Sequence, residues 1–291
     1  AQTFGGGGFE GEAQFGPPPE PREYGAPPAQ GGDGFFIHRQ ELKLGLLAGL
    51  MVGAGVLAFL GRPWMRKAYL GAAVAVLGFG MGGYLCPTAA VQNVFLKAGT
   101  AYLLLFLVPV IGALLLGRLF CGYVCPFGAL QELLHVRRWA LRIPDRLWRV
   151  LSAFRFVVLG YLVVRVLVLH SVAFDGYSPF KPLFAWGGTP GTIAFTAAFA
   201  LLSLVLFRPF CRTLCPYGAL LSILSRFSLF RVGADARCRS CGLCTRACPA
   251  GAMAGGRVDA TECLLCGACA SGCRPAALGL RPFWRRRSGR S

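Results

Sequence analysis

Long apolar stretches alternate with short polar segments along most of the chain. Each stretch has about the 17 to 25 residues that a helix needs to cross a bilayer. The five runs lie near residues 44–60, 68–85, 100–117, 151–169 and 191–207. The pattern therefore predicts a mostly α-helical protein with about five transmembrane helices in a domain over residues 41–232.

Residues 1–40 differ from this pattern because they are rich in Gly and Pro and carry more acidic than basic side chains over most of their length. Such a segment cannot bury enough apolar surface to form a core. We expect it to be a disordered tail.

The composition agrees with a membrane protein. Hydrophobic residues make up 55% of the chain and charged residues 14%, whereas a soluble domain has about 25% charged residues. The formal net charge of +18 would also suit a nucleic-acid partner, but the basic residues flank the apolar runs instead of forming a separate basic domain. We therefore expect membrane lipid, and no nucleic acid, as a partner.

The basic residues concentrate in alternate loops. Loop 61–67, segment 118–150 and the segment after the fifth run are rich in Arg and Lys, whereas loops 86–99 and 170–190 carry one Lys each. Positively charged loops stay in the cytoplasm. The sequence thus predicts a multi-pass protein of the bacterial inner membrane, with its N-terminus outside and its C-terminal domain in the cytoplasm.

A duplicated motif divides the helical domain into two similar units. Residues 118–134 read RLFCGYVCPFGALQELL, and residues 208–224 read RPFCRTLCPYGALLSIL. Two apolar runs separate the two CxxxCP copies, so both copies lie on the same side of the membrane. This predicts a parallel two-helix repeat, over about 68–135 and 151–226, with its pseudo-twofold axis along the membrane normal.

The predicted axis can bring the four thiols of the two motifs together. These are Cys121, Cys125, Cys211 and Cys215. Three interpretations stay open: an additional intramembrane iron–sulfur cluster, redox-active dithiols or a transient metal site, and packing without chemistry. Duplication of both sulfurs together with their flanking residues favours the cluster.

Two longer cysteine runs follow, CRSCGLCTRACP and CLLCGACASGCRP. Each contains CxxCxxCxxxC, the spacing with which bacterial ferredoxins hold [4Fe-4S] clusters. A zinc ribbon or a disulfide framework accounts less well for two tandem runs of this kind. The runs predict a small α+β two-cluster ferredoxin-like domain over residues 233–280, followed by a basic tail at 281–291.

In such domains the fourth Cys of each run ligates the other cluster. The first predicted ligand set is Cys238, Cys241, Cys244 and Cys273. The second is Cys263, Cys266, Cys269 and Cys248. Reduced thiols are typical of the cytosol, which agrees with the placement that the basic loops predict.

A polar pair follows the first CxxxCP motif. Side chains of this kind can accept protons that accompany electron transfer, provided that they lie near the electron acceptor. Glu132 and His135 lie three apart, on one face of the expected amphipathic segment, and we expect them to be the proton acceptors. A solvated interfacial face is the alternative. The second copy carries Ser222 and Ser225 nearby, so any such site would be asymmetric.

The combination of two CxxxCP motifs with two ferredoxin-type runs resembles the NapH/NosR group of membrane-bound polyferredoxins, over roughly residues 65–275. The resemblance implies electron transfer between the quinone pool and other subunits of a membrane redox complex. Because oxidation of a quinol releases protons with its electrons, Glu132 and His135 are then the expected acceptors of the quinol protons. Related proteins of the CcoG/FixG type imply an alternative function, in which the protein reduces a metal ion such as copper during oxidase assembly or senses redox state.

Overall fold

The computed structural model describes residues 40–61, 63–81, 100–141, 143–169, 180–184, 187, 189–254, 257–273 and 277–283. All of them belong to the unit Phe35–Ser291, one of two units into which the chain divides. The predicted disordered tail up to residue 39 and most of the predicted basic tail lie outside the described residues.

The structure is mostly helical, as predicted, and helices form over all five apolar runs. They are α1 (Gln40–Leu60), α2 (Pro63–Ala73) with its π-helical continuation η1 (Val74–Gly80), α4 (Thr100–Leu116), α6 (Asp145–Leu169) and α8 (Pro190–Val205). Two of these helices, α1 and α6, are long and apolar enough to cross a membrane by length and composition. Val52 and Val168 on these two helices are 68% and 69% exposed, so apolar faces point away from the protein.

Short helices follow each CxxxCP motif. In the first half, η2 (Phe120–Val124) leads into α5 (Pro126–Leu134) and then η3 (Arg137–Trp139). After α7 (Phe180–Phe184) and α8, the second half continues with α9 (Pro209–Thr213) and α10 (Pro216–Ser225). Pro126 and Pro216 open α5 and α10, where a missing backbone N–H costs nothing because that group has no helical partner.

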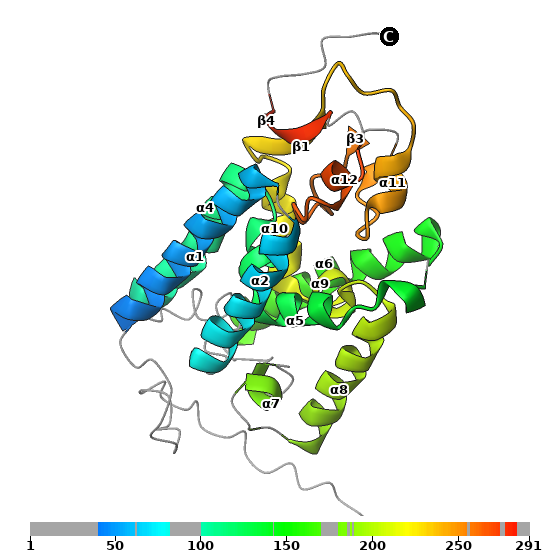
Figure 1. The fold of residues 1–291 in the computed structure, drawn as a ribbon. Coiled ribbons are helices and arrows are strands. Elements are labelled where there is room, and N and C mark those ends of the chain that lie inside the picture. Colours follow the sequence, from blue (N-terminus) through cyan, green and yellow to red (C-terminus); the bar gives the residue numbers. More distant parts are fainter. Residues whose placement is uncertain are drawn as a thin grey trace, which may run out of the picture. The chain divides into compact units, whose positions relative to one another are not determined.

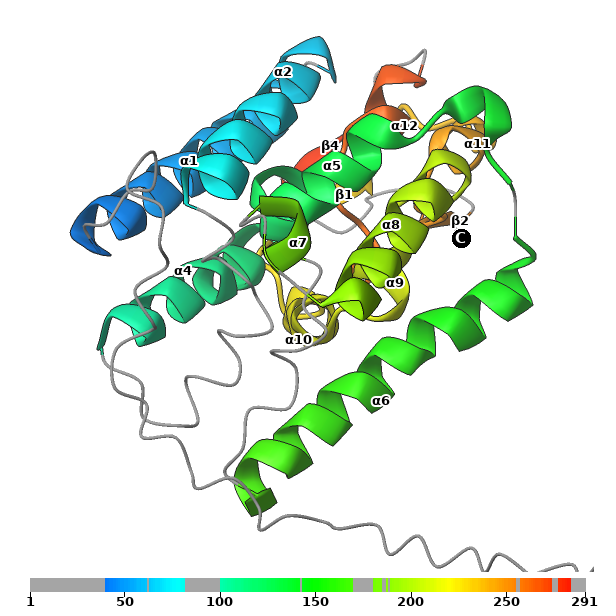
Figure 2. The same cartoon turned by 90° about the horizontal axis from the view of Figure 1, so that it is seen from below.

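The helices of the two halves pack against each other in the same way. Within each half, the first helix contacts the helix that follows the motif, in the pairs α2 with α5 and α6 with α10. Across the halves, α4 contacts α10 and α8 contacts α5, and Figure 2 shows α5 lying alongside α8. Helix α1 lies outside this pattern and packs on α4.

Two aromatic contacts repeat this crossed packing. Phe120 meets Tyr217 edge-to-face with ring centroids 5.7 Å apart. Phe127 meets Phe210 in the same way at 5.1 Å. The members of one pair occupy the motif positions of the other pair. Each half therefore contributes one aromatic ring to each contact.

The segment after α10 is a small α+β unit (Figure 1). Its elements are β1 (Phe230–Ala234), α11 (Leu243–Ala247), β2 (Met253–Ala254), β3 (Arg257–Val258), α12 (Ala268–Ser271) and β4 (Leu278–Pro282). Strands β1 and β4 pair antiparallel, from Phe230 opposite Pro282 to Ala234 opposite Leu278. Strands β2 and β3 form a second antiparallel pair. The first pairing brings the two ends of this segment together.

Candidate functional site

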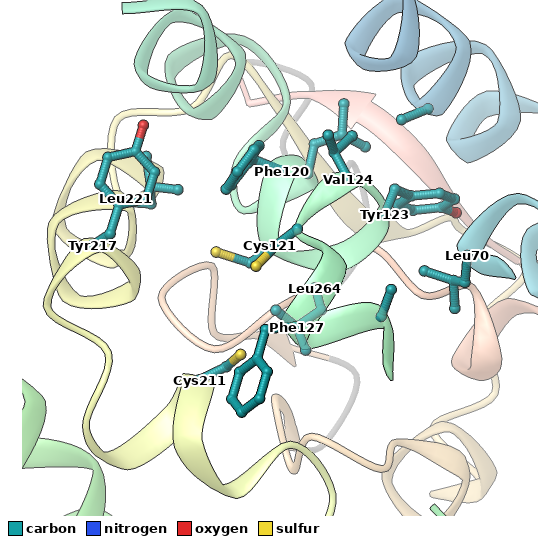
Figure 3. Close-up of a cluster of buried hydrophobic side chains, with 14 of the residues drawn as sticks. Leu70, Phe120, Cys121, Tyr123, Val124, Phe127, Cys211, Tyr217, Leu221 and Leu264 are labelled. Carbon is teal, nitrogen blue, oxygen red and sulfur yellow. The ribbon is translucent and has the colours of Figure 1, made fainter. Parts of the chain in front are cut away.

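The structure places the four CxxxCP cysteines in one buried cluster where the two halves meet. Their exposed fractions are only 5% to 7%. Cys121 lies in η2 and Cys211 in α9, while Cys125 and Cys215 cap the starts of α5 and α10. The thiols of Cys125 and Cys211 contact each other across the halves. Figure 3 shows Cys121 and Cys211 in the same buried cluster.

Two buried arginines flank these thiols. Arg118 and Arg208 each precede the first Cys of a motif by three residues, and neither has any exposed surface. Arg208 crosses to the first motif, where it donates hydrogen bonds to the carbonyl oxygens of Cys121 and Gly122. Arg118 lies within electrostatic reach of Cys121, Cys211 and Cys215. A positive charge from each half therefore lies beside the sulfurs.

The shared Gly-Ala-Leu sequence makes room for these arginines. A Cβ atom at Gly128 would lie 3.1 Å from Nη1 of Arg208, and one at Gly218 would lie 3.4 Å from Nη2 of Arg118. Each arginine thus lies against the glycine of the opposite half. Such a Cβ atom would also lie 3.3 Å from the carbonyl oxygen of Cys121 at Gly128, and 2.9 Å from that of Cys211 at Gly218. Glycine at this position therefore lets each motif fold back on its own first cysteine and leaves space for the arginine.

The residues present fit an iron–sulfur cluster. Nε and Nη2 of Arg118 have no hydrogen-bond partner among the described residues, and buried donors of this kind normally have one. An anionic group between the thiols would supply that partner. No three His, Cys, Asp or Glu side chains in the described part of the chain are close enough to hold a single metal ion. A four-iron cluster needs a wider ligand set, because the cluster itself lies between the sulfurs.

Glu132 is held by two arginines. Arg66 donates from both terminal nitrogens to its carboxylate, and Arg208 donates from Nε at 2.9 Å and Nη2 at 2.5 Å to Oε2. Burial opposes ionisation of Glu132, but the charges and hydrogen bonds of Arg208 and Arg66 outweigh it and lower the pKa of Glu132 to about 2. The carboxylate is therefore ionised and fixed at neutral pH.

The predicted pair of proton acceptors is not on one helix face. Helix α5 ends at Leu134, and His135 caps its end in an extended conformation. His135 Nδ1 lies 3.3 Å from the carbonyl oxygen of Ser203, and its ring packs on Phe207. The carboxylate of Glu132 instead faces Arg66 and Arg208. The role of both residues in quinol chemistry stays a prediction, and His135 has the better chemistry for it because Glu132 is a weak base in this setting.

A second acidic group lies on the other side of the thiol cluster. Glu262, from the ferredoxin-like segment, accepts from Nη2 of Arg155. Its Oε2 lies 3.7 Å from Nη1 of Arg118 and 3.5 Å from Nε of Arg212. Arg155 also donates to Oγ of Ser222 at 3.0 Å. One carboxylate thus faces three nearly buried guanidinium groups.

The two ferredoxin-type runs adopt the same backbone conformation. Ser240 and Leu265 have φ of 53° and 55°, and the glycines two residues later, Gly242 and Gly267, both have φ of 75°. Non-glycine residues rarely adopt positive φ, so the loop geometry is specific. Each run turns in the same sense before α11 or α12 begins.

The predicted second ligand set lines one cavity. Cys248, Cys263, Cys266 and Cys269 all contribute to its wall, together with Leu264 and other apolar residues. Burial raises the pKa of Cys263 and Cys269 to about 12, so these thiols keep their protons at neutral pH unless a metal centre binds them. Four converging thiols in an apolar cavity fit a [4Fe-4S] cluster.

The predicted first set lies nearer the surface. Cys244 is buried and packs in a small apolar cluster that Cys273 also joins. Cys238 is half-buried and Cys241 is exposed. None of the twelve cysteines in the described part of the chain is in a disulfide, which agrees with reduced thiols.

The loop of the second run lies directly on the first CxxxCP motif. A Cβ atom at Gly122 would lie 2.1 Å from the carbonyl oxygen of Leu264, so the two backbones touch. Tyr123 donates its hydroxyl to the carbonyl oxygen of Leu265 at 3.2 Å. Leu264 and Leu265 belong to the same buried core as Cys121, as Figure 3 shows for Leu264.

Sequence reasoning missed the ionic groups around the thiols. The positive-inside pattern uses four of their arginines only as markers of the cytoplasmic side. In the structure each has an exposed fraction of 6% or less; they are Arg66, Arg118, Arg208 and Arg212. The shared Arg before each motif was a usable signal, because a residue repeated with the cysteines indicates a role beside them. Nothing in the sequence singled out Glu262.

Comparison with known proteins agrees with this arrangement. The family described as "4Fe-4S binding domain" matches residues 98–144 and 189–234, two segments that each contain a CxxxCP motif. No solved structure matches the chain significantly. The site and the family match define an iron–sulfur protein of the 4Fe-4S binding type.

Similarity to individual proteins identifies the family within this class of iron–sulfur proteins. The chain is 32% identical over 212 residues to the uncharacterized protein MJ0750 of Methanocaldococcus jannaschii, a match that covers 70% of this chain and 89% of the relative. It is 37% identical over 172 residues to the regulatory protein NosR of Pseudomonas aeruginosa, covering 53% of this chain and 23% of NosR. The putative electron transport protein YccM of Escherichia coli is 29% identical over 231 residues, covering 68% and 62%. The chain belongs to the NapH/NosR-type polyferredoxins, the family that its cysteine motifs predict.

Proposed function

We propose that this chain is a membrane-bound electron-transfer subunit that passes electrons between the quinone pool and a redox partner complex. Two [4Fe-4S] clusters occupy the ferredoxin-like segment, with the two predicted ligand sets. A further iron–sulfur group is held by the four CxxxCP thiols. When bound, such groups supply reversible one-electron transfer. The remaining steps depend on the chain's own residues.

One observation carries the proposal: four buried thiols from two halves meet two buried arginines beside the second cysteine run. A packing role does not need this arrangement. Among the described residues, five buried arginines share two carboxylates, Glu132 and Glu262, and buried positive charge without an equal negative charge is costly. A dithiol needs two sulfurs and could form within one motif. Sulfurs contributed by both halves favour one group bound between them.

The membrane placement is part of the proposal. All five predicted helices cross the bilayer, the N-terminus lies outside, and the ferredoxin-like segment lies in the cytoplasm of a bacterial cell. The exposed apolar faces of α1 and α6 support contact with lipid. The crossed helix contacts and aromatic pairs support a parallel repeat about an axis through the thiol cluster.

Quinone is the proposed substrate. Oxidation of one quinol releases two electrons and two protons, and reduction of a quinone consumes the same numbers. The electrons pass singly to or from the iron–sulfur groups, while the protons need a base at the membrane surface. His135, with Glu132 beside it in sequence, is the proposed base.

The test uses anaerobically purified protein in detergent. A water-soluble quinol analogue should reduce the iron–sulfur signals seen by electron paramagnetic resonance, and dithionite serves as the control for total reducible iron. Reduced protein is then mixed with Cu(II). Reduction by the quinol without turnover of Cu(II) supports the proposal. Dithionite reduction with rapid Cu(II) turnover and no response to quinol would favour the metal reductase function instead.

A further inference from the structure

The two halves differ at one acidic position. Glu132 of the first motif and Ser222 of the second occupy the same place in the duplicated sequence. Glu132 forms ion pairs with the buried Arg66 and Arg208. Ser222 offers only a hydroxyl to Arg155. The second half therefore has a buried cation at this position but no carboxylate of its own.

Glu262 supplies the missing carboxylate from another part of the chain. Arg155 donates both to Ser222 and to Glu262, so the carboxylate lies directly beside the serine. The side chains of Arg118, Arg155 and Arg212 are 0%, 2% and 6% exposed. Among the described residues, Glu262 is the only carboxylate within 4 Å of these three groups.

The backbone next to Glu262 is fixed to the same helices. The carbonyl oxygen of Thr261 accepts from Nη1 of Arg118 and from Oγ of Ser222, both at 2.9 Å. The carbonyl oxygen of Ala260 accepts from Oγ of Ser225 at 2.9 Å. The residue that follows Glu262 is Cys263, the first thiol of the second run. The ionic contact therefore lies one residue away from the cavity of that run.

We propose that Glu262 is a positioning residue that docks the second cysteine run on the helical core. Its carboxylate binds Arg118 of the first half together with Arg155 and Arg212 of the second, and thereby holds Cys263 and Cys266 next to the first CxxxCP motif. The first run, with its exposed Cys241, is left toward solvent, where a redox partner can reach it. This inference rests on the proposed function, which gives the docking its role in electron transfer. The docking itself can be tested separately.

The experiment compares E262A with the double variant E262A/S222E in the full-length protein. The double variant returns a carboxylate to the arginines from within the second half, so it restores the charge without the contact from Glu262. S222A is measured beside it as a control, because Ser222 itself donates to the carbonyl oxygen of Thr261. Amide hydrogen exchange is measured over residues 261–267, with strand β1 as the internal reference. Iron content and the resonance signal of the reduced clusters are recorded on the same samples.

We expect E262A to accelerate exchange over 261–267 by roughly a hundredfold, because loss of one member of a buried ion pair destabilises the contact strongly. The double variant should recover the thermal midpoint but neither the exchange protection nor the wild-type resonance signal. Recovery of all three would overturn the proposal, since charge balance alone would then explain the role of Glu262. Unchanged exchange in E262A would overturn it as well.

Failure of the docking and failure of the quinone function give different results. If E262A does not fold, E262Q keeps the size of the side chain and its hydrogen bonds to Arg155, and the same exchange comparison applies. If the wild-type protein shows the expected exchange pattern but no reduction by a quinol analogue, the docking stands and the quinone function fails. If quinol reduces the protein but neither E262A nor E262Q changes the exchange, the quinone function stands and the docking fails.

Discussion

Arg208 of the second half donates a hydrogen bond to the carbonyl oxygen of Cys121 in the first half. The same guanidinium group also binds Glu132, so one side chain fixes both the turn that carries a thiol and the helix that follows it. Arg118 occupies the matching position beside the second motif. Arg208 therefore holds the first motif, whereas Arg118 lies against Gly218 of the second motif and donates to the carbonyl oxygen of Thr261.

The Arg208–Glu132 contact predicts a large stability effect. E132Q leaves Arg66 and Arg208 buried without a counter-charge, and breaking such a pair costs about 3 to 5 kcal/mol. We expect a clearly lower thermal midpoint in detergent. E41Q is the matched control, because Glu41 is exposed at the start of α1. Equal midpoints for the two variants would contradict a structural role for Glu132.

The pH dependence follows from the pKa of Glu132. The ordinary pKa is 4.5, and the folded protein lowers it to about 2. A lowered pKa gives stability that is fully present above pH 4.5 and is lost as the pH falls toward 2. Thermal midpoints of metal-free protein should therefore fall across this window, and less steeply in E132Q. Parallel slopes for the two proteins would count against the ion pair.

Loss of a CxxxCP thiol should remove iron without damaging the ferredoxin-like segment. C125S should lose about four irons per chain, because each cluster of this type contains four. C266S should lose a similar amount, but from the second run. Iron analysis combined with resonance spectra distinguishes the two losses. Full iron content in both C125S and C215S would show that these thiols bind no cluster.

The contact between Gly122 and Leu264 can be tested by substitution. Alanine at this position would clash with the carbonyl oxygen of Leu264, whereas a Cβ atom at Gly71 would meet nothing within 4 Å. We expect G122A to expose residues 261–267 to hydrogen exchange or to limited proteolysis, while G71A remains like wild type. Identical protection in the two variants would mean that the loop does not rest on Gly122.

The predicted topology can be tested by labelling. A short peptide tag suits this purpose better than an introduced cysteine, because the native thiols would also react with the label. Tags at both ends, probed in intact cells and in inverted vesicles, should report an outer N-terminus and a cytoplasmic C-terminus. An outer C-terminus would contradict the positive-inside assignment and place the cysteine runs in an oxidising compartment.

The helices were predictable from the sequence because their signal is local. Apolar runs of this length favour helices because strands are shorter, and each of the five helices begins within about six residues of its expected start. The cysteine spacing likewise predicted that Cys248, Cys263, Cys266 and Cys269 would lie together, and they line one cavity; that they ligate a cluster stays a prediction. Both predictions depend on residues that are close in sequence or follow a known spacing rule.

The ionic contacts could not be predicted in this way. Arg155 and Glu262 are 107 positions apart, and neither belongs to a motif. The end of α5 was also missed, because His135 is compatible with a helix in sequence but caps it in the structure. Contacts between distant polar residues depend on the final packing, which hydrophobic periodicity does not encode.

The antiparallel pairing of β1 and β4 determines where a second protein can be fused to this chain. Phe283 donates its backbone N–H to the carbonyl oxygen of Leu229, and Leu229 in turn donates to Leu114 at the end of α4. The chain between Leu229 and Phe283 therefore leaves the helical core and returns to it at the same point. A protein fused after Phe283 keeps this hydrogen bond and would therefore be attached where strands β1 and β4 lie beside the end of α4.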